Sequence, residues 1–169
     1  MRRILDSIYD GTSWLAALGM IGVLVWVLLS IVTRQLGINL PGTDAYAGYS
    51  MAAAGFLALA PTLKRNEHIR VTLLLGRLKG AAGQALQMWA LTVAVLLAGL
   101  FAYYSVRLAW ESHVINDVST GNDATPLWIP QIAMALGTVV LLIALIDEWV
   151  LQLRGRRREA APEEALHNE

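Results

Sequence analysis

Four long stretches without a charged residue constrain this 169-residue chain more than any other feature. Each is bounded by charged side chains, and together they cover residues 11–33, 45–63, 80–106 and 124–146. Crossing a hydrocarbon core of about 30 Å takes about 20 apolar helical residues, because a backbone in lipid must satisfy its own hydrogen bonds. The pattern predicts an all-α integral membrane protein whose four transmembrane helices span about 11–33, 45–63, 82–106 and 124–146. The second span is the shortest.

The composition supports a membrane setting and excludes several kinds of site. Hydrophobic residues make up 56% of the chain and charged residues only 15%, whereas soluble domains carry about 25% charged residues. The 13 basic and 13 acidic residues balance, so no overall positive field indicates nucleic-acid binding. The absence of cysteine excludes disulfides, thiolate metal sites and iron–sulfur clusters.

The basic residues are distributed unevenly between the two sides that four spans create. Before the first span, between the second and third, and after the fourth lie Arg2, Arg3, Lys64, Arg65, Arg70, Arg77, Lys79, Arg154, Arg156, Arg157 and Arg158. Only Arg34 and Arg107 fall on the other side. Because cytoplasmic loops are enriched in lysine and arginine, this distribution predicts that both termini lie in the cytoplasm. We read the first apolar segment as an uncleaved helix, because it exceeds the length of a signal-peptide core.

The predicted inner loop contains an amphipathic pattern over residues 67–79. Apolar residues recur at helical spacing, and basic residues flank them; the predicted membrane anchors are Val71, Leu74, Leu75, Leu78, Arg77 and Lys79. This pattern predicts a short helix in the membrane interface that binds phospholipids through its basic side chains. Contact with another protein is the alternative, because Ile69 and Leu73 add a second apolar side.

The outer segments and the tail show no regular pattern. Residues 111–125 are rich in turn-forming side chains and predict an exposed loop. Residues 1–150 are expected to form one four-helix membrane domain, and residues 151–169 a cytoplasmic tail that is first basic, then acidic, and disordered. Small residues recur four apart at Gly48 and Ala52, Ala54 and Ala58, and Ala133 and Gly137. Such pairs allow close helix packing, either within this chain or with a second subunit.

No pattern in the chain indicates catalysis or a cofactor. None of the four spans contains Asp, Glu, Lys, Arg or His, although sites for ions, protons and charged solutes in membranes usually require one. His68, His113 and His167 all lie outside the spans, where they could not ligate a haem between helices. Metal-protease, nucleophile-elbow and phosphate-loop motifs are also absent. We therefore expect neither an enzyme nor a protein that moves a charged solute unaided.

Several short motifs resemble the small membrane subunit, the Q-type or DctQ-like component, of tripartite ATP-independent periplasmic (TRAP) transporters. The resemblance covers about residues 10–150 and is carried by Arg34, Gly37, Pro41-Gly42-Thr43-Asp44, Phe56-Leu57-Ala58-Leu59-Ala60, His68-Ile69-Arg70-Val71, Leu73-Leu74-Leu75, Trp128-Ile129-Pro130 and Gly137. One departure is that Asp44 is followed by Ala45, where relatives often have a second acidic residue.

The resemblance implies a set of partners and a location. It implies a multi-pass protein of the bacterial cytoplasmic (inner) membrane that serves as a noncatalytic scaffold for a large permease subunit on a separate chain. A periplasmic substrate-binding protein would deliver an organic acid for sodium-driven symport. Candidate partner contacts are Arg34, Asp44, His68 and Arg70, although Arg34 and Asp44 could instead pair with each other. The alternatives are a membrane-anchor subunit of an enzyme complex and a small exporter that works as an oligomer.

Overall fold

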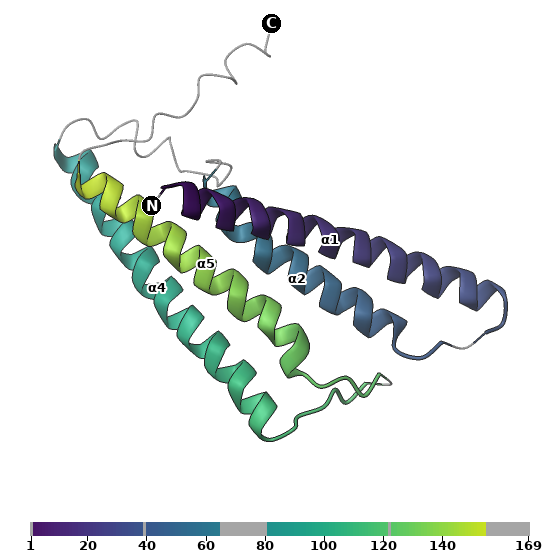
Figure 1. The fold of residues 1–169 in the computed structure, drawn as a ribbon. Coiled ribbons are helices and arrows are strands. Elements are labelled where there is room, and N and C mark those ends of the chain that lie inside the picture. The colour runs from purple at the N-terminus through teal and green to yellow at the C-terminus, as the bar shows by residue number, and fades with distance from the viewer. Residues whose placement is uncertain (1, 39, 65–80, 122, 155–169) are drawn as a thin grey trace, which may run out of the picture.

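The computed structural model describes residues 2–38, 40–64, 81–121 and 123–154. In these ranges the chain forms four helices, α1 (Arg2–Gln35), α2 (Thr43–Lys64), α4 (Ala81–Val114) and α5 (Trp128–Leu153). Figure 1 shows them as two antiparallel hairpins, α1 with α2 and α4 with α5. The described residues contain no strand, only an isolated bridge between Val118 and Pro126. The all-helical prediction is confirmed.

Three of the four helices have the length and composition of a membrane span. They are α1 over Leu5–Gln35, α4 over Gly83–Val114 and α5 over Trp128–Leu153. With 34 residues each, α1 and α4 are about 51 Å long, so they exceed the hydrocarbon thickness and must tilt or project from it. The helices thus extend well past the predicted boundaries. The predicted interfacial helix at 67–79 and the tail from residue 155 lie outside the described residues.

The second predicted span is a helix of 22 residues whose most apolar stretch is less hydrophobic than those of the other three helices. Its first half, residues 45–55, is mostly alanine, glycine, tyrosine and serine, with Met51 as the only large aliphatic side chain. Pro61 lies inside this helix, in its last turn but not at its end. Packing against other helices takes the place of a strongly apolar surface on α2, because α1 packs along one side of α2 and α5 along another.

Small residues allow these close approaches. A Cβ added to Gly19 of α1 would lie 3.0 Å from the backbone nitrogen of Ala54 in α2. A Cβ added to Gly137 of α5 would lie within van der Waals overlap of the carbonyl oxygen of Phe56 in α2. Ala54 and Gly137, two members of the small-residue pairs, therefore serve contacts within this chain. Gly48 has an open position, with no neighbouring atom within 4 Å of an added Cβ.

The order of neighbours is α1, α2, α5 and α4, because α4 packs against α5. This arrangement is an open row, and it buries little. A small core of Tyr9, Ala60, Val140 and Ala144 joins α1, α2 and α5. In the most apolar part of each outer helix, only 6% of α1 and 11% of α4 is buried. The outer helices therefore present most of their apolar surface to whatever surrounds the chain.

Candidate functional site

The antiparallel arrangement creates two ends, each with its own polar contacts. The terminal end contains the start of α1, the end of α2, the start of α4 and the end of α5 (Figure 1). The loop end contains the α1–α2 turn and the α4–α5 loop. Since no motif indicates catalysis, the functional candidates are the surfaces at these ends that could contact a partner.

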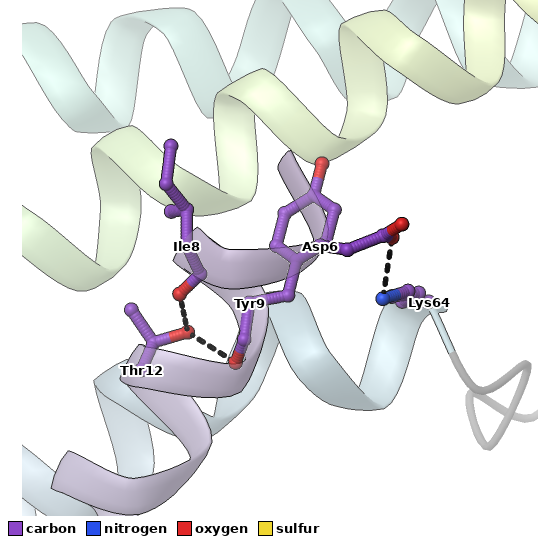
Figure 2. Close-up of polar contacts among 5 residues, drawn as sticks. All are labelled: Asp6, Ile8, Tyr9, Thr12 and Lys64. Atoms are coloured by element: carbon purple, nitrogen blue, oxygen red, sulfur yellow. Dashed lines mark hydrogen bonds and ion pairs between the residues drawn. The ribbon is translucent and has the colours of Figure 1, made fainter. Parts of the chain in front are cut away.

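At the terminal end, an ion pair joins the first helix to the second. The Nζ atom of Lys64 lies 2.7 Å from Oδ1 of Asp6 and 5.3 Å from the centre of the Tyr9 ring (Figure 2). Tyr9 is only 3% exposed, and the hydroxyl of Thr12 donates to the carbonyl oxygens of Ile8 and Tyr9 at 3.2 and 3.0 Å. We call Asp6, Tyr9 and Lys64 the terminal clasp. The terminal clasp holds Lys64, the last residue of α2, against α1.

A second set of polar contacts closes the terminal end between α4 and α5. The indole nitrogen of Trp149 donates to the hydroxyl of Thr92 at 3.0 Å, and the amide nitrogen of Gln152 donates to the side-chain oxygen of Gln87 at 3.3 Å. A hydrogen bond between exposed helix surfaces contributes about 1 kcal/mol, but it restricts how two helices rotate against each other. These contacts therefore set the relative orientation of α4 and α5.

At the loop end, α1 stops in a glycine-terminated cap. The amide of Ile38 donates to the carbonyl of Thr33 at 2.9 Å and that of Gly37 to Arg34 at 3.2 Å, which is a Schellman motif. Gly37 has φ +70°, which a glycine adopts without strain. The cap turns the chain sharply and leaves Arg34 in the last turn of the helix.

A polar cavity of about 350 Å³ lies between this cap and the start of α2. We call it the turn pocket, and its walls include Ser30, Thr33, Arg34, Gly37, Ile38, Leu40, Pro41, Gly42, Thr43 and Asp44. The structure brings Arg34 and Asp44, both predicted partner contacts, to this one cavity. Among the described residues they form no ion pair with each other. Asp44 instead accepts a long hydrogen bond of 3.5 Å from the hydroxyl of Ser30.

The α4–α5 loop folds back over the start of α2. The hydroxyl of Tyr49 donates to Oδ2 of Asp123 at 2.9 Å, and the hydroxyl of Ser119 donates to Oδ1 at 2.8 Å. The hydroxyl of Thr125 donates to that of Tyr46 at 3.2 Å. The hydrogen bond from Ser119 does most to stabilise the carboxylate, that from Tyr49 adds to it, and the pKa of Asp123 falls from 3.8 to about 2. We call Tyr46, Tyr49, Ser119, Asp123 and Thr125 the loop clasp.

The prediction of a plain exposed loop over residues 111–125 is wrong in two respects. Residues up to Val114 belong to α4, and Asp123 is half-buried in the loop clasp. A Cβ added to Gly42, which has φ +87°, would lie 2.8 Å from Cβ of Asp123. The α1–α2 turn and the α4–α5 loop therefore lie against each other and form one surface.

Aromatic stacking continues this surface into the helices. The Trp26 ring of α1 stacks on Tyr46 with centroids 4.8 Å apart, and Tyr46 meets Tyr49 edge to face at 6.1 Å. Trp26 lies well inside its predicted span, and the structure gives it a partner in the first turn of α2. Sequence reasoning missed this cluster. Its signal was the pair Tyr46 and Tyr49, which lie three apart on one face of the predicted helix.

An apolar groove of about 360 Å³ lies between α4 and α5 near the loop end. His113 meets Trp128 edge to face at 5.2 Å on its wall, and Ala109 and Ala135 are among its small residues. His113 therefore packs against an aromatic ring. The described residues include no group of three His, Cys, Asp or Glu side chains that could hold a metal ion.

The remaining predicted contacts cannot be placed. His68 and Arg70, together with the predicted interfacial anchors Val71, Leu74, Leu75, Leu78, Arg77 and Lys79, lie outside the described residues. Lys64 of the terminal clasp is the last described residue before them. These eight positions therefore stay predictions.

Comparison with known proteins assigns a family. The family model described as "Tripartite ATP-independent periplasmic transporters, DctQ component" matches residues 23–155. The match includes the part of α1 from residue 23 onward and all of α2, α4 and α5, and with them the turn pocket and the loop clasp. A search among curated proteins found no match.

Proposed function

The chain belongs to the family of DctQ components of tripartite ATP-independent periplasmic transporters, and from this premise we propose that it is the noncatalytic scaffold of such a transporter. The family makes it a small permease component and, with its three span-like helices, a protein of the bacterial inner membrane. In our proposal it holds a separate large permease subunit in place and does not itself bind the solute.

The observation that carries the scaffold role is the open row of helices. A chain that transports alone needs a path enclosed by its own helices, whereas here α1 and α4 stand at opposite ends of the row. Their exposed apolar side chains include Leu18, Ile21, Val25, Leu97 and Leu100. An apolar surface this extended supports contact with lipid on one side and a second membrane protein on another.

The absence of charge at membrane depth agrees with this role. The four predicted spans contain no Asp, Glu, Lys, Arg or His, so they carry no charged side chain to compensate a carboxylate or a sodium ion within the bilayer. We therefore propose that the large subunit supplies those sites and drives uptake of an organic acid by sodium symport. The identity of the acid would be set by that subunit and by the binding protein.

We further propose an orientation for the scaffold. Both termini and the segment 65–80 lie in the cytoplasm, because most of the lysine and arginine residues fall on that side. The loop end then faces the periplasm, where the binding protein approaches the large subunit. The amphipathic segment 67–79 rests in the cytoplasmic interface and fixes the depth of the scaffold.

Removing the chain from its native membrane tests the scaffold role. We expect the large permease subunit to fall in abundance and uptake of solute to be lost, and re-expression of the chain should restore both. Gentle solubilisation of the tagged chain should also recover the large subunit in stoichiometric amount. A large subunit that inserts, persists and transports normally without this chain would contradict the proposal.

A further inference from the structure

We propose that the turn pocket binds the headgroup of a phosphoethanolamine lipid. The site is the cavity of about 350 Å³ at the α1–α2 turn, which has a cationic and an anionic side chain on its walls. The proposal rests on the place of the chain in a membrane and does not depend on the scaffold role. The argument uses the two charges, the depth of the pocket and its hydroxyl groups.

The two charged side chains match the two charges of this headgroup. Arg34 and Asp44 line one cavity, yet among the described residues they do not pair with each other. The planar guanidinium of Arg34 suits a phosphate, which it can bind through two parallel hydrogen bonds. The carboxylate of Asp44 suits an ammonium group that can donate hydrogen bonds. One zwitterionic ligand can therefore satisfy both side chains.

The hydroxyl groups of the pocket add to this match. Ser30 donates to Asp44 over a long 3.5 Å, a weak bond that a stronger donor can replace. Thr33 already donates to the carbonyls of Leu29 and Ser30 at 2.8 and 3.2 Å, so its oxygen is free only to accept. The walls of the cavity therefore offer the ammonium group of the ligand two acceptors, the Asp44 carboxylate and the Thr33 hydroxyl.

The turn itself indicates the depth of the pocket. Leu36, Ile38 and Leu40 are 67%, 54% and 42% exposed, which is unfavourable for three large apolar side chains in water. Lipid resolves this, because apolar residues beside the end of a membrane helix insert at the boundary of headgroups and acyl chains. With these side chains in the boundary, the adjacent pocket lies at the level of the phosphates.

The charge pattern predicts selectivity among common headgroups. Phosphatidylglycerol offers a phosphate to Arg34 but no cation to Asp44. Phosphatidylcholine offers a cation without an N–H donor, so its ammonium cannot form a hydrogen bond with the carboxylate. Of these three lipids, only phosphatidylethanolamine satisfies both side chains. We therefore expect the chain to prefer it over the other two at equal acyl-chain composition.

Native mass spectrometry of the full chain in detergent tests this preference. The probes are phosphatidylethanolamine, phosphatidylglycerol and phosphatidylcholine with identical acyl chains. We expect Arg34→Gln to weaken phosphatidylethanolamine binding about tenfold, because one charge-assisted contact is lost, and Arg34→Lys to restore part of it. Asp44→Asn should weaken phosphatidylethanolamine binding and strengthen phosphatidylglycerol binding, because the repulsion is removed.

Arg107→Gln is the matched control, because Arg107 is an exposed arginine that pairs with Glu111 at 2.7 Å, outside the pocket. It should leave the lipid preference unchanged. Equal affinity for the three lipids, or an equal loss in Arg107→Gln, would overturn the proposal. So would Arg34→Gln and Asp44→Asn variants that bind lipid normally but no longer recover the large subunit. That last result would assign the pocket to a protein contact and leave the scaffold role intact.

Discussion

The hydroxyl of Tyr49 in α2 donates a hydrogen bond of 2.9 Å to the carboxylate of Asp123 in the α4–α5 loop, 74 residues further along the chain. This contact joins the two hairpins at the loop end, as the small core around Tyr9 does near the terminal end. Between these points α5 also packs against α2 at Gly137 and Phe56, so the loop clasp adds to the contacts that hold the two hairpins together.

Breaking the loop clasp should reduce stability in a pH-dependent way. The folded-state pKa of Asp123 is about 2, below its ordinary value of 3.8, so its stabilisation is fully present above pH 4 and is lost as the pH falls toward 2. Asp123→Asn should therefore lower Tm in detergent at pH 7, and the difference from wild type should vanish near pH 2. A difference that stays constant from pH 7 to pH 2 would show that the charge of Asp123 is not involved.

Gly137 should tolerate no side chain. Gly137→Ala places a methyl group against the backbone of Phe56, so α5 must move away from α2 at a cost of about 1–3 kcal/mol. Thermal unfolding of the purified chain measures this loss. Gly48→Ala is the matched control, because the added methyl meets no atom within 4 Å and alanine favours the helix. Equal Tm values for the two variants would contradict the close α2–α5 contact.

The terminal clasp should contribute modestly. The side chains of Lys64 and Asp6 are 25% and 49% exposed, so solvent screens their ion pair and the coupling should be about 0.5–1 kcal/mol. A double-mutant cycle with Asp6→Asn and Lys64→Gln, followed by thermal unfolding, measures that coupling. Asp10→Asn, an exposed acid on the same helix, should give no coupling to Lys64→Gln. A coupling free energy of zero between Asp6 and Lys64 would show that their ion pair does not stabilise the fold.

The proposed orientation can be read out with single cysteines, because the natural chain has none. Thr120→Cys in the α4–α5 loop should react with a membrane-impermeant maleimide applied from the periplasmic side. Asn168→Cys in the C-terminal tail should react only after the membrane is permeabilised. Labelling of both positions from the same side would refute the proposed topology.

The predicted interfacial segment can be tested by charge insertion. Leu74→Asp combined with Leu78→Asp should release residues 67–79 from the lipid surface, because the charged form cannot be buried there without a large desolvation cost. Limited proteolysis on the cytoplasmic side should then cut this segment faster than in wild type. Asp substitutions at Ile69 and Leu73, on the other side of the predicted helix, provide the comparison. Unchanged proteolysis would remove these anchors from consideration.

Local patterns predicted the helices, because hydrogen bonding within a helix and the length of an apolar run are properties of neighbouring residues. The charges that bound each run located the helices but not their ends. Asp10 and Arg107 were treated as limits of spans, whereas α1 and α4 continue through them. Polar side chains near the helix ends find partners: Asp6 pairs with Lys64 of α2, and Arg107 pairs with Glu111 one turn away. Where a helix ends therefore depends on neighbouring turns and helices, which the charge pattern alone does not reveal.

The candidate site was predicted only in part. Arg34 and Asp44 were singled out from the turn between two helices, and the structure places both in the turn pocket. Tyr46, Tyr49 and Asp123 were not, because an acidic residue in a loop carries no sign of which helix it will meet. The alternative pairing of Arg34 with Asp44 does not form among the described residues, although the two side chains line one cavity.

By itself, the sequence determined that this chain is a helical membrane protein, which of its segments are apolar and which family it resembles. The first two follow from composition and spacing along the chain, and the resemblance is carried by short motifs. Only the tertiary structure decided the order α1, α2, α5, α4, the stacking of Trp26 on Tyr46 and the contact between Tyr49 and Asp123. Such contacts depend on how closely the helices approach. At Gly19 and Gly137 the approach is limited by backbone atoms of α2. No sequence pattern in α2 indicates which of its backbone atoms these glycines will meet.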